Sequence, residues 1–286
     1  MPATRVDEAV TLPGSVLARE TVRTWNLNVS LLELDEAWSF IAKKQKQVSP
    51  VDPAEYGDAY VWIGMDATNK AIVSYVVGKR TADNAQELAA DLRARILNRP
   101  QITTDGLAAY IAAIDEAFGI DCDYAMLQKE YAAVPGNDAA HRYSPGAIIG
   151  VEKQVITGNP DPGKISTSYV ERQNLTLRMG IRRMTRLTNA YSKRFRNHAA
   201  AIALHVAHYN LCRVHETLRV TPAMAIGVTT HIWTVGELIQ DALAMPAEPS
   251  PIVPAAPPKL PRDPGTGLLV GRRPFTLRVI RGGKLR

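Results

Sequence analysis

The chain has 286 residues, of which 46% are hydrophobic, and it carries a formal net charge of +6. This length suits one or two globular domains, and the positive charge favours polyanionic partners, nucleic acid first. The sequence holds neither a signal-peptide pattern nor an apolar run of about 18 residues, so we expect a cytoplasmic protein with no membrane contact. Cys122 and Cys212 form no Cys-x-x-Cys pair and are expected to be reduced rather than bound to zinc.

The first clear element is a strand predicted over residues 29–43, after a weakly patterned N-terminal segment, residues 1–28. Its residues alternate between a bulky apolar face and a face of small residues that includes Asp35. Glu36 lies on the bulky face, where a carboxylate is costly unless it is paired or at an edge. Asp35 is therefore the better catalytic candidate of the two.

Strands and helices alternate from residue 60 to residue 128. The pattern predicts a hairpin of strands closed by a turn at Asp66, a helix capped by Thr81 or Asp83, and a later helix with Ile111 among its inward residues. The expected segments are strands at 60–65, 71–77, 101–104 and 120–128, and helices beginning near residue 82 and at 107–118.

Asp105 follows the strand at 101–104 directly and has two readings. It is either a helix N-cap, which is a common use of aspartate, or a carboxylate at the carboxyl end of a strand. Open α/β sheets place their chemistry at such strand ends. The residues alone leave these two readings about equal.

A polar loop, residues 131–166, is rich in Gly and Pro and is expected to be mobile or to contact substrate. A helix is then predicted over Ser168–Arg196, with a single acid, Glu171, among eight Lys and Arg residues. Helical periodicity places Asn174, Arg178 and Arg182 near the azimuth of Glu171. This stripe joins a candidate metal ligand to groups suited to phosphate, although a surface helix with scattered arginines remains the alternative.

The next helix is predicted from Asn197 to Cys212 and holds three histidines, read as surface or DNA-facing residues: His198, His205 and His208. A capping box, Thr234 with Glu237, opens a last helix. Eight prolines within residues 246–264 predict a disordered linker before a basic tail. We therefore expect three regions: 1–28, a catalytic core at 29–245, and a tail at 246–286.

The carboxylates of Asp35, Asp105 and Glu171 occur in the element order by which ribonuclease H-like folds bring three acids together. The sequence also resembles the DDE transposases of bacterial insertion sequences, of the insertion-sequence-one type. The segments that carry the resemblance are Leu34–Lys46 (LDEAWSFIAKKQK), Thr103–Tyr110 (TTDGLAAY), Ser168–Lys193 and Tyr209–Gly227. It implies an α/β ribonuclease H-like fold, a mixed five-stranded sheet flanked by helices.

The resemblance also implies a site and a reaction. Asp35, Asp105 and Glu171 match the family's catalytic acids and would hold two Mg²⁺ or Mn²⁺ ions, which prefer oxygen ligands. Such enzymes cut double-stranded DNA at transposon ends and join the 3′-OH to target DNA, as a homo-oligomer in a synaptic complex. The expected DNA contacts are Arg178, which matches a basic position of the family, and Arg182, Arg183, Arg186, Lys193 and Arg194.

Two alternatives remain at this stage. The chain is either a nuclease of the same fold that cleaves without joining, or a DNA-binding remnant of a transposase without catalytic activity. Family members usually carry a DNA-binding region before the first aspartate, and only 34 residues precede Asp35 here. Recognition of the transposon ends is therefore an open part of the prediction.

Overall fold

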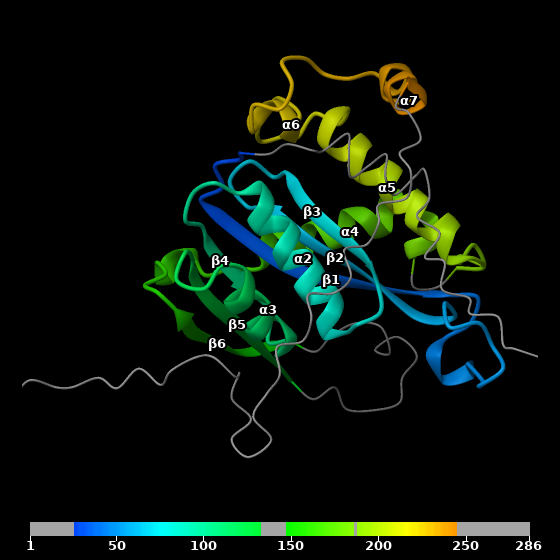
Figure 1. Ribbon diagram of the computed structural model, residues 1–286, viewed down its shortest axis with the longest axis horizontal. Coiled ribbons are helices and arrows are strands. Elements are labelled where there is room, and N and C mark those ends of the chain that lie inside the picture. The colour runs from blue at the N-terminus through cyan, green and yellow to red at the C-terminus, as the bar shows by residue number, and fades with distance from the viewer. Residues whose placement is uncertain (1–25, 133–146, 186–187, 245–286) are drawn as a thin grey trace, which may run out of the picture. The chain divides into compact units, whose positions relative to one another are not determined.

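The computed structural model describes residues 26–132, 147–185 and 188–244 (Figure 1). Most of the expected N-terminal segment, the Pro-rich tail and Arg186 lie outside these described residues. None of the helices in the described ranges combines the length and apolar character that a membrane span requires.

A mixed sheet forms the centre of the described chain, with six strands in the order β3-β2-β1-β4-β5-β6 (Figure 1). β1 is antiparallel to β2 and parallel to β4; β4 and β5 are parallel, and both edge strands pair antiparallel with their neighbours. The strands are β1 (Leu31–Ile41), β2 (Gly57–Asp66), β3 (Ile72–Gly78), β4 (Gln101–Thr104), β5 (Asp123–Tyr131) and β6 (Ile148–Thr157). The predicted α/β class is confirmed, with one strand more than expected.

The additional strand is β6, which lies within the segment that was predicted to be a loop. β6 pairs with β5 along its length and forms an edge of the sheet. Its apolar residues gave no burial signal because Ile149, Val151 and Val155 are 68%, 53% and 54% exposed. A strand that buries neither face strongly does not show the alternation on which the prediction depends.

Helices cover both faces of the sheet. α2 (Ala82–Arg95) and α3 (Ala109–Ala117) lie on the front face in Figure 1, and α4 (Ser168–Gly180) and α5 (Phe195–Leu211) pack on the other. The remaining helices are short: α6 (Pro222–Ala225), α7 (Val235–Ala244), and the 3₁₀ turns η1 (Gln45–Gln47), η2 (Pro162–Lys164) and η3 (Arg182–Met184).

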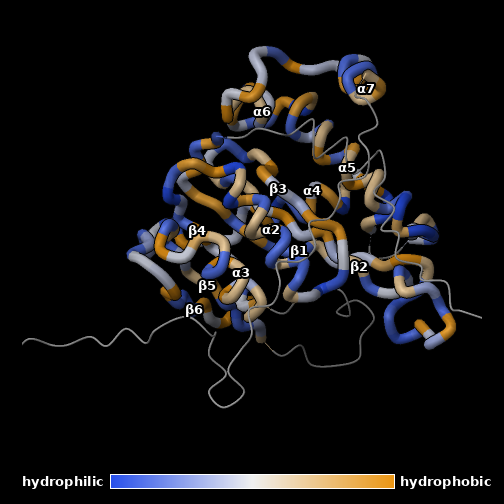
Figure 2. Tube along the Cα trace, in the orientation of Figure 1, coloured by the Kyte–Doolittle hydropathy of each residue, from blue (hydrophilic) through white to orange (hydrophobic). Residues whose placement is uncertain are grey.

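Each face of β1 contributes to a different hydrophobic core. Leu32 and Leu34 pack with α2 and α3, whereas Ala37 packs with α4 and α5. Figure 2 shows hydrophobic residues concentrated along the central strands and interspersed with hydrophilic residues along the helices. The alternation predicted for this strand is therefore correct, and burying each leucine contributes about 1.5–3 kcal/mol.

Local capping follows the sequence signals closely. Thr81 accepts a hydrogen bond from the backbone of Asn84, and the Thr234–Glu237 pair forms the reciprocal capping box at the start of α7. Asp66 accepts backbone hydrogen bonds within its turn, as expected. Ile111 is the exception, because it is 39% exposed rather than directed inward.

The helix predicted over Ser168–Arg196 is wrong in its extent. α4 ends at Gly180, Ile181 adopts an extended conformation, and α5 does not begin until Phe195. Glycine in a helix costs roughly 1 kcal/mol relative to alanine, and a Cβ on Gly180 would approach the His205 ring to 2.9 Å. The chain leaves the helix here, and Met184 enters the core between α4 and α5.

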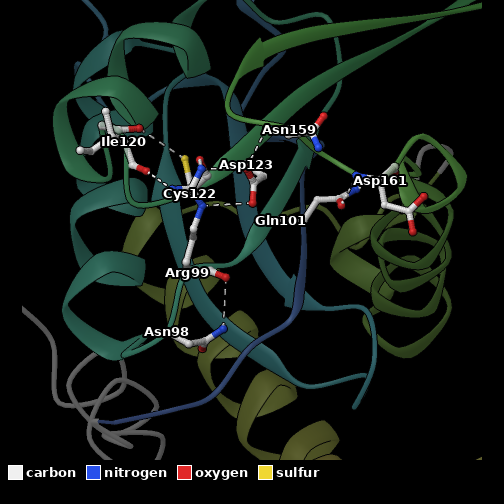
Figure 3. A network of polar contacts seen from close by, with 9 residues as sticks. Asn98, Arg99, Gln101, Ile120, Cys122, Asp123, Asn159 and Asp161 are labelled. Atoms are coloured by element: carbon white, nitrogen blue, oxygen red, sulfur yellow. Dashed lines mark hydrogen bonds and ion pairs between the residues drawn. The ribbon is translucent and has the colours of Figure 1, made fainter.

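A polar network at the amino ends of β4 and β5 holds the connection that leads to α4 (Figure 3). Arg99 donates to both carboxylate oxygens of Asp123, at 3.1 and 2.8 Å. Gln101 and Asp161 exchange two hydrogen bonds between side chain and backbone. These contacts lie at the end of β4 opposite Asp105, and they fix the start of η2 on the sheet.

Candidate active site

Asp35 and Asp105 come together because β1 and β4 are adjacent parallel strands. Leu34 of β1 is paired with Thr104 of β4, so the residue that follows each stands beside the other. One carboxylate oxygen of Asp35, one of Asp105 and one of Glu36 all lie within 4.8 Å of one another. The strand register thus builds a compact group of three acids at the carboxyl end of β4.

Glu171 lies in the first turn of α4 and lines the same cleft as Asp35 and Asp105. Its Oε1 accepts a hydrogen bond from Thr167 Oγ1 at 2.6 Å and forms an ion pair with Lys129 of β5. The structure therefore brings all three predicted acids to one cleft. Glu171 differs from the aspartates because a lysine already neutralises its charge.

Two contacts clamp α4 onto β1. Glu33 Oε2 accepts hydrogen bonds from the backbone N–H groups of Tyr169 and Val170, at 2.8 and 3.0 Å. Asn174 Nδ2, one turn further along, donates to Asp35 Oδ2 at 2.8 Å. Glu33 thus supplies the anion that the positive end of the helix favours, and these contacts set the position of Glu171 relative to Asp35.

Sequence reasoning missed Glu33, although a signal was present. Glu33 and Asp35 are two residues apart and therefore share one face of β1. Glu33 is only 4% exposed, and a carboxylate so deeply buried requires donors. The alternation could have identified a second acid on this face, but not the helix end that satisfies it.

Burial and mutual repulsion raise the pKa values of the clustered acids. Burial, with the charge of Asp105 as the next cause, raises the pKa of Asp35 to about 6 and that of Glu36 to about 7. Burial also raises the pKa of Asp105, against the opposing effects of the Leu107 N–H and the Arg80 guanidinium. Such a group of acids is costly when fully ionised, and a bound cation would remove that cost.

Glu36 was expected to be the weaker catalytic candidate of the two neighbours, and the structure places it in the acidic group. Its side chain is 2% exposed and pairs with Arg80, whose Nη2 lies 3.1 Å from Glu36 Oε2 and 3.7 Å from Asp105 Oδ2. The requirement that a carboxylate on the apolar face must be paired is therefore met. The ranking of Glu36 below Asp35 overlooked that Asp105, at the end of its strand, is accessible from both faces of β1.

The N-cap reading of Asp105 is wrong, because the N-cap of α3 is Ala108. Asp105 Oδ1 instead accepts a hydrogen bond from the Leu107 N–H at 3.0 Å in the turn after β4. A Cβ added to Gly106 would approach the Gln128 side chain of β5 to 2.7 Å, so the turn packs tightly. The local hydrogen bond thus holds a carboxylate that also lines the cleft.

The predicted DNA-contacting residues that the structure describes lie either on α4 itself, as Arg178 does, or in the chain that follows it. Arg178 is half-buried in the last turn of α4, on the side of Asn174. Arg182 lies beyond the helix in η3, so the predicted stripe through Glu171 stops at Arg178. Arg182, Lys193 and Arg194 are exposed, Lys193 lies over the Tyr191 ring, and Arg183 donates to the Asn197 carbonyl.

The surface reading of the α5 histidines is wrong for His198. This residue is fully buried, with Ser39 Oγ 3.0 Å from its Nε2 and Ser192 Oγ 2.8 Å from its Nδ1. Burial lowers the pKa of His198 to about 4, so the ring is neutral at neutral pH. His198 therefore ties α5 to β1, whereas His208 is exposed.

No family model matches the chain. It is 24% identical over 172 residues to the insertion element iso-IS1n protein InsB of Shigella dysenteriae, a match that covers 60% of this chain and 90% of that protein. The predicted resemblance to insertion-sequence transposases is confirmed.

Two solved transposases are more loosely similar. One is the piggyBac transposase in a synaptic complex with hairpin DNA, at 12% identity and a TM-score of 0.36, covering 75% of this chain and 52% of that one. The other is the Mos1 transposase in a paired-end complex with a transposon end, at 15% identity and a TM-score of 0.23, covering 43% and 45%. The chain thus spans about half the length of these two proteins.

Proposed function

We propose that this protein is a transposase that cuts DNA at the ends of its element and joins the resulting 3′-OH to target DNA. The observation that carries the proposal is the meeting of three acids from distant parts of the chain in one cleft. Asp35 comes from β1, Asp105 from the end of β4 and Glu171 from α4. The similarity to an insertion-element protein supports this reading of the cleft.

The donor set fits divalent cations of the Mg²⁺ or Mn²⁺ type. All three acids offer oxygen atoms, and the oxygens of Asp35 and Asp105 are close enough to share an ion. Asp35, Asp105 and Glu171 would hold two ions in this proposal. When bound, such ions lower the pKa of an attacking water or 3′-hydroxyl and stabilise the leaving oxygen.

The remaining side chains position the acids and the DNA. Asn174 fixes the orientation of Asp35, and Thr167 and Lys129 hold Glu171. Cationic side chains on and after α4 would bind phosphates of double-stranded DNA without reading its sequence: Arg178, Arg182, Arg183, Arg186, Lys193 and Arg194. Because two transposon ends are joined in one event, the protein would act as a homo-oligomer. It would act in the cytoplasm, where bacterial DNA lies.

Strand transfer by the purified protein tests the proposal. The substrate is a pre-cleaved transposon end with a 3′-OH, together with a plasmid target and Mg²⁺ or Mn²⁺. We expect joined product from the wild type and a loss of at least about 100-fold with Asp105→Asn, which removes a cation ligand but preserves shape. Glu116→Gln, an exposed change on α3, is the matched control and should retain full activity.

Two other results would contradict the proposal in different ways. Metal-dependent cleavage of the ends without any joining would identify a nuclease. Salt-sensitive DNA binding with neither cleavage nor joining would identify a binding remnant. The pre-cleaved substrate separates these cases because it makes joining independent of the first cut.

A further inference from the structure

The charge of the buried Glu36 carboxylate is poorly compensated. Its side chain is 2% exposed, and its hydrogen-bonding neighbours are the Arg80 guanidinium and the buried hydroxyl of Tyr110. A neutral hydroxyl does not balance the charge of a buried carboxylate, and Arg80 is shared with Asp105. The same carboxylate offers an oxygen within 4.8 Å of oxygens from Asp35 and Asp105.

A second observation is that a cationic side chain of the protein itself occupies the space between two of these carboxylates. The guanidinium of Arg80, from the connection between β3 and α2, lies between the carboxylates of Glu36 and Asp105 at 3.1 and 3.7 Å. The Arg80 side chain is 43% exposed, so it can turn away from the carboxylates into solvent without leaving a cavity in the core. Arg80 is therefore a counter-ion of both carboxylates that reaches them from the solvent side.

The charges of the group do not balance with Arg80 alone. Three carboxylates, from Asp35, Glu36 and Asp105, face a single guanidinium, while the charge of Glu171 is matched by Lys129. A divalent cation would neutralise more of this charge than one arginine, and carboxylate oxygens are the ligands such cations prefer.

We propose that Glu36 is a fourth carboxylate ligand of the cation site, and that a bound divalent cation replaces the Arg80 guanidinium between Glu36 and Asp105. This inference rests on the proposed function, because it concerns the same site. It extends the ligand set beyond the three acids that the family resemblance implies. It also makes Arg80 a competitor of the cation, since both use the same two carboxylates.

Titration of the full chain with Mn²⁺, followed by calorimetry in the absence of DNA, tests this inference. We expect Glu36→Gln to weaken Mn²⁺ binding by at least about tenfold, because a charged oxygen ligand becomes a neutral amide. Arg80→Gln should tighten Mn²⁺ binding, because the competing cation is gone. Glu116→Gln should leave the affinity unchanged, and a thermal melt of each variant establishes that it is folded.

The outcomes separate this inference from the proposed function. Wild-type Mn²⁺ affinity in Glu36→Gln, together with lost affinity in Asp105→Asn, would overturn the role of Glu36 and leave the proposed function intact. Unchanged affinity in both variants would remove the cation site and the proposed function with it. If Glu36→Gln does not fold, Arg80→Gln still decides: tighter binding supports the exchange, and equal or weaker binding overturns it.

Discussion

Asp35 and Glu36 are neighbours in sequence whose side chains occupy opposite faces of β1. Asp35 faces α4, where Asn174 donates to it, and Glu36 faces α3. Both reach the carboxylate of Asp105 because that residue follows the last position of β4 and is not confined to one face. A single strand thus delivers two acids to one point, and both are destabilised when ionised.

This conflict predicts that Asp35→Asn stabilises the fold while it abolishes strand transfer. The pKa of Asp35 is raised from 3.8 to about 6, so the folded state binds its proton more tightly than the unfolded state. The ionised carboxylate therefore costs stability above pH 6, and the cost disappears as pH falls toward 4. With a chelator present, we expect the variant to be more stable at pH 7.5 by on the order of 2 kcal/mol, measured by urea unfolding.

The control for this measurement is Glu116→Gln, which removes a carboxylate from the exposed side of α3. It should change the free energy of unfolding by no more than about 0.5 kcal/mol at either pH. If Asp35→Asn proved less stable than the wild type at pH 7.5, the hydrogen bond from Asn174 would outweigh the burial cost. The assignment of a strained, ionised Asp35 would then be wrong.

At the scale of elements, the contact between β1 and α4 determines the geometry of the site. Glu33 and Asp35 each accept hydrogen bonds from α4, at its first turn and one turn further along. The N-cap residue, Thr167, makes no side-chain cap and instead donates to Glu171. Glu33 of β1 therefore caps α4, and the Thr167 hydroxyl hydrogen-bonds to Glu171 instead.

Glu33→Ala should accordingly weaken the contact between α4 and β1. The loss of two charge-assisted hydrogen bonds is expected to cost about 1–3 kcal/mol of stability and to speed amide exchange at Tyr169 and Val170. Because Glu171 follows directly, Mn²⁺ affinity should fall as well. Hydrogen exchange followed by mass spectrometry, together with calorimetry, measures both effects.

The matched control is Thr221→Ala, which removes the side-chain cap of α6, remote in sequence from the site. It should cost about 1 kcal/mol of stability and leave Mn²⁺ affinity unchanged. Equal losses of Mn²⁺ affinity in both variants would mean that Glu33 acts through general stability alone. A selective loss in Glu33→Ala would identify it as a positioning residue.

The sequence was informative wherever a local pattern determines the structure. The alternation of β1, the Asp66 turn and the Thr234 capping box were all predicted correctly. The end of α4 was missed, because its basic character continues past Gly180 while the backbone turns to bury Met184. The pairing of Lys129 with Glu171 depends on strand neighbours that no local pattern reveals.

Whether the three acids belong to one site was predictable only from the family resemblance. Periodicity placed Asp35 on the correct face of β1 but left Asp105 divided between a cap and a catalytic role. The register of β1 with β4 places Asp105 beside Asp35, because Leu34 pairs with Thr104. The need of Glu36 for a partner was predictable, but Arg80 as that partner was not, since the contact joins positions 44 residues apart.

At the scale of the whole molecule, the excess of positive charge is unevenly distributed. The chain has 34 Lys and Arg residues against 28 Asp and Glu, and its cations are concentrated in and after α4. Four acids line the cleft beside that helix: Asp35, Asp105, Glu130 and Glu171. This arrangement would hold DNA by its phosphates next to the carboxylates, a binding mode that depends strongly on salt.

Arg194→Gln should therefore weaken DNA binding and make the affinity less dependent on salt concentration. If this exposed arginine contacts one phosphate, its removal lowers the slope of log affinity against log salt by about 0.9, to a similar degree on any DNA sequence. Arg93→Gln on α2 removes the same charge from the opposite face of the sheet and is the matched control. Fluorescence anisotropy at several salt concentrations measures both slopes. An equal change in both variants would show that net charge, and not a surface around α4 and α5, determines where DNA binds.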